Sequence, residues 1–306
     1  MKLTVGIAQF APVVLDLHDS VRKACRLIAS AGKQGVRLLA FPETWLPVYP
    51  VWADMGSYSQ WGNDAAKKLY ARLHGNALEV RSPEAKRIAE ACKKARVHVV
   101  LGVNERAGKT LYNSLLFVDD KGKLVGHHRK LVPTFGERLV WGYGGGEGLR
   151  AVETKYGKVG GLICWEHWMP PARQVLHTEG EVIHIAAWPH GKELHQLASR
   201  HYAFEGRCFV LLAAMYLERG MFPKDYELRH ELNGQPEVLL NGGSAIIGPD
   251  GAYLVEPVFG KEELIAAEID TQRAVEESIT LDVAGHYSRP DVFELIVRRR
   301  RSPSEG

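Results

Sequence analysis

Short β-rich runs alternate with helical segments along most of the chain, and this alternation constrains the fold more than any other feature. The run LTVGIAQ (3–9) precedes a helical pattern over 20–35, which is followed by VRLLAFPE (36–43). A second round is SPEAKRIAEACKKA, with Ser82 at the N-cap and Pro83 at the first helical position, and then VHVVLGV. This pattern predicts an α/β fold in which helices cover mixed sheets.

The second half of the chain continues the pattern. KVGGLIC (158–164) precedes a helix expected from Pro170, and EVIHIAAWP (181–189) precedes a helix ending at Gly206 and a strand CFVLLAAMY. Residues 114–125 and 244–255 each read as an apolar strand, a Gly-containing turn and a returning strand, which predicts two β-hairpins. Since no linker divides the chain, we expect one domain over residues 1–290 and a tail over 291–306.

Composition is that of an ordered globular protein, with 45% hydrophobic and 25% charged residues. Lys and Arg outnumber Asp and Glu by 39 to 36, but the run Arg298–Arg301 accounts for the whole excess. A nearly neutral body argues against a nucleic-acid-binding protein, because such a protein needs a basic face on its folded part. No run approaches the roughly 20 apolar residues that cross a bilayer, so we expect no membrane association.

The four cysteines are Cys25, Cys92, Cys164 and Cys208, and their wide spacing forms neither a disulfide framework nor a zinc pattern. The apolar start of the chain is broken by Gln9 and Pro12 and does not resemble a signal peptide. We therefore expect a cytoplasmic protein. Helical spacing places Cys25 and Cys92 in the core, and Cys208 opens a buried strand.

Cys164 occupies a different position, in GLICWEHWMPPAR (161–173). It ends an apolar run and precedes the helix expected from Pro170, so its sulfur should lie in a tight strand-to-helix turn. Such a turn can expose a nucleophile and direct the following backbone N–H groups toward one point, although a cysteine at a strand end is more often a packing residue. Glu166 and His167 are too close in sequence to pair well with the thiol, and we interpret both as structural.

Charged residues at the ends of other strands are better partners for this thiol. Glu43 follows an apolar strand and Pro42, while Lys130 and Glu137 surround a loop after another strand. Loops at strand ends commonly assemble a functional site. Each residue also has an ordinary alternative: Glu43 as a helix cap, Lys130 as a surface charge and Glu137 as an ion-pair partner of a nearby arginine.

The stretches FPETWLP, HRKLVPTFGER and GLICWEHWMPPARQ resemble the signature blocks of the nitrilase superfamily of carbon-nitrogen hydrolases. They occur in the family's order, and further matches such as AAWP, SRHYAFEGRCFVL and GHYSRPDVFEL extend the resemblance over nearly the whole chain. It implies an αββα sandwich that dimerises into a four-layer core. It also implies a catalytic triad of Glu43, Lys130 and Cys164 supported by Glu137.

Physical chemistry is consistent with these implied roles. Burial beside a like charge would raise the pKa of Glu43, which could then accept the Cys164 proton and later activate water. The Lys130 ammonium and the Trp165 backbone N–H could stabilise a tetrahedral intermediate, at about 3 kcal/mol per donor. Glu137 would orient the lysine or the attacking water.

Within the superfamily, CWEH, PTFGER and LPVYPVW are most similar to nitrilases and cyanide-degrading relatives. The resemblance therefore implies hydrolysis of a small organic nitrile to the carboxylic acid and ammonia through a thioimidate, with no metal and no organic cofactor. Aromatic abundance favours aryl or arylaliphatic nitriles over cyanide. Candidate substrate-binding residues are Tyr49, Trp52, Trp165, Trp168 and Trp188, of which we expect two or three to contact substrate.

Two features depart from the family pattern. Gly145, in WGYGGGEG, stands where nitrilases commonly have the Asp of a Gly-Asp-Gly motif. The chain also lacks the long tail that many nitrilases use in spiral assembly, so a homodimer or a small homo-oligomer is as compatible with the sequence as a filament.

Two other functions fit the same residues. An amidase or carbamoylase of the same fold would use the same triad on a C–N single bond. A non-catalytic partner module would keep the fold but leave Cys164 no more reactive than the other three cysteines.

Overall fold

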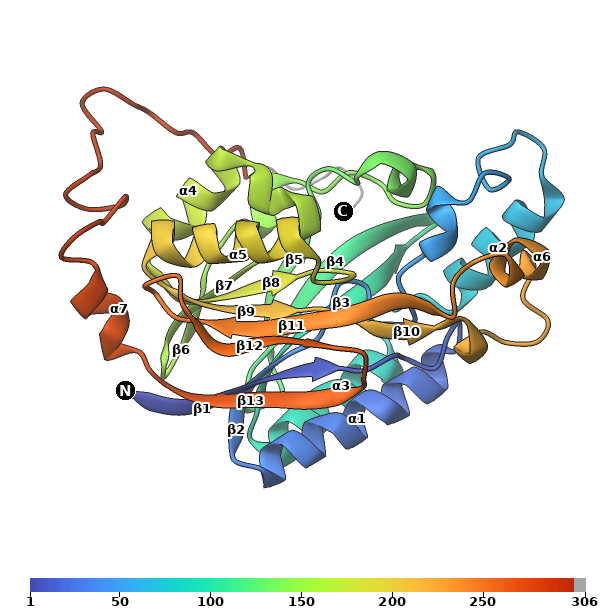
Figure 1. Ribbon diagram of the computed structural model, residues 1–306, viewed down its shortest axis with the longest axis horizontal. Coiled ribbons are helices and arrows are strands. Elements are labelled where there is room, and N and C mark those ends of the chain that lie inside the picture. Colours follow the sequence, from blue (N-terminus) through green and yellow to red (C-terminus); the bar gives the residue numbers. More distant parts are fainter. Residues whose placement is uncertain (300–306) are drawn as a thin grey trace.

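A computed structural model describes residues 1–299, in which two β-sheets lie face to face between layers of helices (Figure 1). The α/β sandwich expected from the sequence is therefore confirmed, as a single domain. The predicted tail, residues 291–306, falls partly outside the described residues. Within 1–299, no helix combines the length and the apolar character needed to span a membrane.

The first sheet contains six strands, with parallel pairing between its central strands β1, β2 and β3 and antiparallel pairing elsewhere. Their order across the sheet is β13 (Glu263–Asp270), β1 (Lys2–Gln9), β2 (Val36–Ala40), β3 (His98–Ala107), β4 (Thr110–Val118) and β5 (Leu124–Arg129). The hairpin predicted over 114–125 is confirmed as the β4–β5 pair.

The second sheet contains seven strands and is parallel over β7, β8 and β9. Its order is β10 (Tyr216–Glu218), β11 (Val238–Ile247), β9 (Phe209–Ala213), β8 (Glu181–Ala187), β7 (Gly157–Ile163) and β6 (Val152–Thr154), with β12 (Tyr253–Phe259) also paired to β11. The second predicted hairpin is confirmed as the β11–β12 pair.

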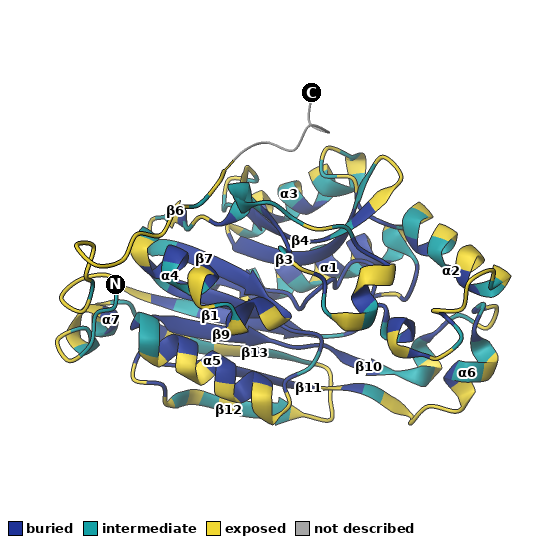
Figure 2. Ribbon diagram, turned by 90° about the horizontal axis from the view of Figure 1, so that it is seen from above, coloured by how far each residue is buried: buried dark blue, intermediate teal, exposed yellow. Residues whose placement is uncertain are grey.

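Helices cover the outer face of each sheet (Figures 1 and 2). Helices α1 (Leu17–Lys33) and α3 (Pro83–Ala95) lie against the first sheet, and α4 (Pro170–Glu179) and α5 (Glu193–Gly206) lie against the second. The shorter helices are α2 (Asp64–Gly75), α6 (Arg229–Asn233) and α7 (Gln272–Glu277). Five 3₁₀ turns complete the described elements: η1 (Val51–Asp54), η2 (Phe135–Leu139), η3 (Gly146–Gly148), η4 (Cys164–Trp168) and η5 (Arg219–Met221).

Local sequence explains where the helices begin. Ser82 accepts a hydrogen bond from the Ala85 N–H at 3.2 Å, which confirms the predicted N-cap of α3. Helix α1 begins at Leu17, three residues earlier than predicted, because Asp16 caps it by accepting from the Asp19 N–H at 2.9 Å. It also ends two residues earlier than predicted, since Gly35 has a φ of +84° that does not continue a helix.

Alternating side chains of the first sheet enter two cores. On β2, Leu39 packs in the cluster shared with α1 and α3, whereas Leu38 and Ala40 pack in the cluster between the two sheets. Cys92 and Cys208 are buried as predicted, but Cys25 is only half-buried, because it lies at the margin of the α1 face that contacts α3. Burial on both faces makes this sheet a rigid support for the loops at its ends (Figure 2).

Candidate active site

Three polypeptide segments deliver charged or nucleophilic side chains to one buried point. Glu43 follows β2, Lys130 follows β5 and Cys164 follows β7. The Lys130 ammonium donates to Glu43 Oε1 at 2.8 Å and to Glu137 Oε2 at 2.6 Å. All four side chains are buried, so the structure brings together the four residues to which the sequence pointed.

Glu137 is held by hydrogen bonds from two sides. It lies in η2, where its Oε2 accepts from the Thr134 N–H at 2.7 Å. Its Oε1 accepts from the Tyr49 hydroxyl at 2.9 Å. Both oxygens of this carboxylate therefore have partners, which fixes the direction from which it faces Lys130.

The turn after β7 places the thiol beside both carboxylates. Cys164 has a φ of +53°, a conformation that non-glycine residues rarely adopt and that costs about 1–3 kcal/mol. One oxygen of Glu43, one of Glu137 and Cys164 Sγ lie within 4.8 Å of one another. Two carboxylates and a thiol can bind a metal ion, but here the Lys130 ammonium lies between the carboxylates as their counter-charge.

Asn113, on β4, also contacts this cluster, although no motif in the sequence pointed to it. Its Nδ2 donates to Glu43 Oε1 at 2.6 Å, and its carbonyl accepts from the Lys130 N–H at 2.8 Å. Glu43 Oε1 thus accepts two hydrogen bonds, while the buried Oε2 has no hydrogen-bond partner among the described residues. An amide side chain inside the β-rich run TLYNSLLFV was the signal that could have identified Asn113.

Burial and charge set the protonation of these groups. Burial raises the pKa of Glu43 to about 7, with Lys130 opposing and Glu137 reinforcing the shift. Burial, followed by the charge on Glu43, raises the pKa of the Cys164 thiol well above its usual value. Although burial opposes it, the neighbouring thiol and carboxylates raise the pKa of Lys130. The cluster therefore holds a permanent ammonium, a protonated thiol and a carboxylate that titrates near neutrality.

Glu166 and His167 have the structural positions that the sequence indicated. Glu166 is buried and accepts from the Leu131 N–H and the Ile163 N–H, both at 2.7 Å. It also contacts the His128 ring at 3.0 Å. His167 is buried, with its Nδ1 2.7 Å from the Cys164 carbonyl oxygen. Both residues thus hold the turn that carries Cys164.

The five candidate aromatic residues lie in different environments. Trp165 and Trp168 are 42% and 38% exposed and contact each other, with ring centroids 6.2 Å apart. Trp52 and Trp188 are fully buried, Trp52 near Tyr226 and Trp188 stacked on His167. A role for these side chains in substrate binding stays a prediction.

A cleft of about 650 Å³ borders the buried cluster on the side of Tyr49. Tyr49 lines this cleft and donates to Glu137, so it connects the cleft to the charged residues. Other lining residues are Val51, Met55, Pro189, His190 and Leu240. A mixed apolar and polar wall of this kind is usual for a small-molecule site.

Gly145, which replaces the family's usual Asp, lies in extended backbone with a φ of −108°. A Cβ added there would lie 2.1 Å from Glu147 Oε2. A larger residue at position 145 therefore requires the Glu147 side chain to move away.

Comparison with known proteins agrees with this geometry. The carbon-nitrogen hydrolase family model matches residues 4–276. "Nitrilase 2" from an unknown prokaryotic organism is 40% identical over 99% of this chain and 94% of its own length. A bifunctional nitrilase/nitrile hydratase of Lupinus angustifolius is 38% identical over 95% of this chain and 85% of its own length.

Solved structures agree at the level of the fold. A carbon-nitrogen hydrolase from Helicobacter pylori superposes with a TM-score of 0.73 at 19% identity, covering 95% of this chain and 97% of that chain. Because the family model spans most of the residues and the relatives are similar over nearly their full lengths, the chain belongs to the carbon-nitrogen hydrolase family.

Proposed function

We propose that this chain is a nitrilase that hydrolyses a small organic nitrile to its carboxylic acid and ammonia, with Cys164 as nucleophile. The observation that carries the proposal is the buried cluster in which Glu43, Lys130 and Cys164 meet, with Glu43 Oε2 unpartnered among the described residues. That oxygen is the free acceptor for the thiol proton, since Oε1 already accepts from Lys130 and Asn113. The relatives named nitrilase favour a nitrile as substrate.

In the first half of the reaction, Glu43 Oε2 takes the Cys164 proton and the thiolate attacks the nitrile carbon. The new C–S bond forms as one C–N π bond breaks, and the nitrile nitrogen takes the proton back from Glu43 to give a thioimidate. Lys130 and the Trp165 backbone N–H stabilise the negative charge that develops during the attack. Such charge stabilisation by fixed donors in a dry site is commonly the largest catalytic term.

Hydrolysis of the thioimidate then consumes two water molecules. Glu43 removes a proton from the first water as its oxygen adds to the thioimidate carbon and passes that proton to the nitrogen. The resulting tetrahedral species loses ammonia, which takes the hydroxyl proton with it, and a thioester remains. A second water, activated in the same way, releases the carboxylic acid and returns the thiol. If the C–S bond breaks before ammonia leaves, the amide is released instead, and the bifunctional relative is named for both outcomes.

Glu137 is proposed to support the triad rather than to exchange protons. Its two oxygens accept from Tyr49 and Thr134 in addition to Lys130, so it has a fixed direction. Its charge keeps Lys130 in place and helps to raise the pKa of Glu43 into the range useful for a general base at neutral pH.

The test is a side-by-side assay of aliphatic, aryl and arylaliphatic nitriles, cyanide and the amides that match the organic nitriles, following ammonia and acid. We expect nitrile turnover to exceed amide turnover. Faster turnover of the amides would favour an amidase of the same fold. No turnover of any compound, together with a Cys164 no more reactive to iodoacetamide than the other cysteines, would favour a non-catalytic module.

We also propose a homodimer or higher homo-oligomer in the cytoplasm. Helix α5 exposes Leu194, Leu197 and Phe204, which are 54%, 56% and 48% accessible, and an apolar outer face of this kind favours contact with a second copy. The four cysteines are unpaired, as expected in a reducing compartment. Light scattering coupled to size-exclusion chromatography tests the assembly, and a monomer would contradict it.

A further inference from the structure

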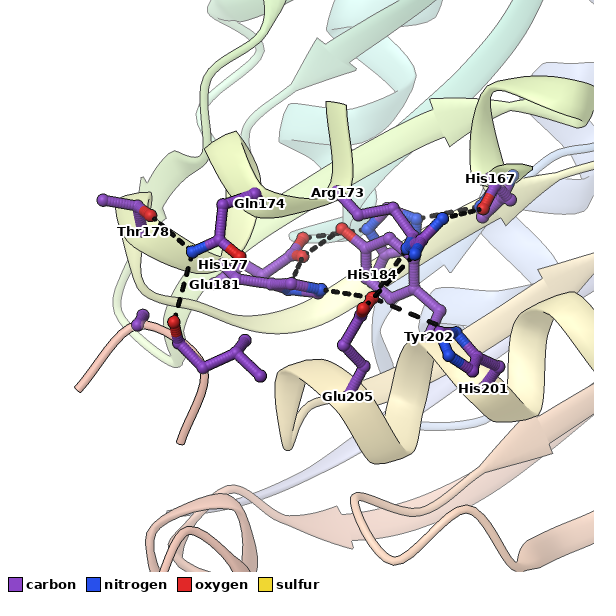
Figure 3. Close-up of polar contacts among 12 residues, drawn as sticks. His167, Arg173, Gln174, His177, Thr178, Glu181, His184, His201, Tyr202 and Glu205 are labelled. Carbon is purple, nitrogen blue, oxygen red and sulfur yellow. Dashed lines mark hydrogen bonds and ion pairs between the residues drawn. The ribbon is translucent and has the colours of Figure 1, made fainter. Parts of the chain in front are cut away.

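A chain of buried hydrogen bonds leads from the nucleophile turn into the layer between β8 and α5. His167 Nδ1 lies 2.7 Å from the Cys164 carbonyl oxygen, and His167 Nε2 lies 3.0 Å from His184 Nε2. At the far end, His184 Nδ1 lies 2.8 Å from Glu181 Oε2. Figure 3 shows the two rings and the carboxylate in a row, and all three side chains are buried.

The hydrogen-bonding capacity of each group assigns the protons along this chain. A carbonyl oxygen can only accept, so His167 donates through Nδ1–H. A neutral imidazole has a single N–H, so His167 Nε2 accepts, and His184 must donate to it through Nε2–H. His184 Nδ1 faces the Glu181 carboxylate, and an ionised Glu181 can only accept there, so the chain of hydrogen bonds then requires protons on both His184 ring nitrogens.

The surroundings of Glu181 favour its ionised form. The Tyr202 hydroxyl donates to Glu181 Oε1, and the His177 ring forms an ion pair with the same oxygen at 3.3 Å. Although burial opposes ionisation, the charge on His184 and the contacts with both histidines lower the pKa of Glu181 to about 2. Burial, and then the neighbouring His184, hold the pKa of His167 well below its usual value, so this ring stays neutral.

The carbonyl that His167 contacts belongs to the same peptide unit as the Trp165 N–H. A trans peptide is planar, and its C=O and N–H point in opposite directions. Holding the Cys164 oxygen therefore directs the Trp165 N–H to the other side of the peptide. Burial raises the pKa of the Cys164 thiol, and the Trp165 N–H opposes that rise, so this donor acts on the sulfur. Donation to the carbonyl also polarises the amide and strengthens its N–H as a donor.

Neighbouring groups lock the His167 ring in this direction. Trp188 stacks on it with ring centroids 4.7 Å apart, and Arg173 donates to the His167 carbonyl oxygen at 3.0 Å. The Trp188 carbonyl in turn accepts from the Glu43 N–H at 3.3 Å. The stacked side chains of His167 and Trp188 thus connect the turn that carries Cys164 with the turn that carries Glu43.

We propose that His167 is a positioning residue that directs the Trp165 N–H at the developing negative charge, and that an imidazolium at His184 paired with Glu181 keeps His167 in the required tautomer. The inference rests on the proposed function, because it assigns His167 to the reaction of Cys164. It predicts an effect on the transition state rather than on substrate affinity.

Two substitutions separate this role from simple packing. His167→Phe keeps an aromatic ring beside Trp188 but removes the donor, whereas His167→Asn offers a side-chain N–H near the position of Nδ1. We expect kcat to fall about 10- to 100-fold in His167→Phe, less than for loss of an oxyanion donor itself. KM should change less than about twofold. His167→Asn should recover most of the lost kcat.

The matched control is His201→Asn. His201 lies at the outer, solvent-exposed end of the same polar group (Figure 3), 3.9 Å from Glu205, and its substitution should leave kcat and the melting temperature unchanged. Wild-type kcat in His167→Phe would overturn the proposal. An equal loss in the Phe and Asn variants, with normal folding of both, would also overturn it, because a purely structural role predicts that result.

A second measurement is independent of turnover and is made on the wild-type protein, with one variant used only for assignment. Nitrogen-15 NMR of wild-type protein labelled at histidine, with His184 assigned by its loss in His184→Gln, should show both His184 ring nitrogens protonated near pH 7.5. A neutral His184 would overturn the proton assignment. If the wild-type enzyme hydrolyses no nitrile, the proposed function fails, whereas this measurement still decides whether the histidine chain exists as described.

Discussion

The Lys130 ammonium lies 2.8 Å from Glu43 Oε1 although 87 residues separate the two in sequence, and neither side chain has any accessible surface. A buried charge pair of this kind is held by the strands on either side of it. Because a second carboxylate, Glu137, lies 2.6 Å from the same ammonium, the cluster has a net negative charge whenever both carboxylates are ionised. Burial, reinforced by the charge on Glu137, gives the free oxygen of Glu43 its affinity for a proton.

Replacing the nucleophile should abolish turnover without unfolding the protein. Cys164→Ala removes one buried sulfur and nothing that holds the turn, since the carbonyl and N–H of residue 164 are backbone groups. We expect no detectable ammonia release and a far-UV circular dichroism spectrum like that of the wild type. Activity close to that of the wild type would reject Cys164 as the nucleophile.

Glu43 should set the acid limb of the pH profile. As a base it must be ionised, and its pKa is raised to about 7, so kcat/KM should fall about tenfold per pH unit below neutrality and level off above it. Glu43→Gln should lose about 10²- to 10⁴-fold in kcat. The profile is measured between pH 3.5 and 9, and a limb near pH 4.5 would show that an ordinary exposed carboxyl is responsible.

Removal of the Asn113 side-chain amide should shift the acid limb of the pH profile to higher pH. The Asn113 hydrogen bond favours the charged form of Glu43, so its loss in Asn113→Leu raises the pKa of Glu43 further. A hydrogen bond to a charged group contributes about 1.5–3 kcal/mol, which moves the limb upward by about one to two pH units. Activity should therefore be low at pH 7 and recover toward pH 9. An acid limb at the same pH as in the wild type would contradict the assignment of that limb to Glu43.

Removing the central cation should damage both stability and catalysis. Lys130→Met leaves two buried carboxylates without a counter-charge, and we expect a loss of about 3–5 kcal/mol in the free energy of unfolding by urea, together with severe loss of kcat. Lys67→Met removes an exposed, solvent-screened pair with Asp64 and should leave stability unchanged. Equal effects of the two substitutions would mean that the buried pair contributes little.

The turn that carries Glu43 should tolerate no side chain at position 102. A Cβ on Gly102 would lie 2.0 Å from the Pro42 carbonyl oxygen and 2.7 Å from the Thr44 nitrogen. Gly102→Ala should therefore displace Glu43, with a cost of about 1–3 kcal/mol in stability and a fall in kcat. Gly75→Ala, at the end of α2 with open space around it, is the control and should have wild-type activity and stability.

Local sequence determined the elements and the short-range structure of this protein. The alternation of β-rich runs with helical segments, the Ser82–Pro83 helix start and both hairpins depend on neighbouring residues, so they could be read directly. The sequence likewise showed that Glu43, Lys130 and Cys164 each follow the end of a strand. The expectation that these three residues and Glu137 form one site came from the motif resemblance, because separation along the sequence does not give distance in space.

Only the tertiary structure decided which buried polar atoms meet. Asn113 contacts Glu43, and His184 contacts His167, across strand pairings and layer packing that no local pattern specifies. The complete burial of Trp52 and Trp188 was likewise not predictable residue by residue, because a position beside a motif does not show whether a side chain is buried. Periodicity predicts which face of an element is apolar, but the partner of a buried donor depends on which elements pack together, and that is settled by the summed packing of the whole domain.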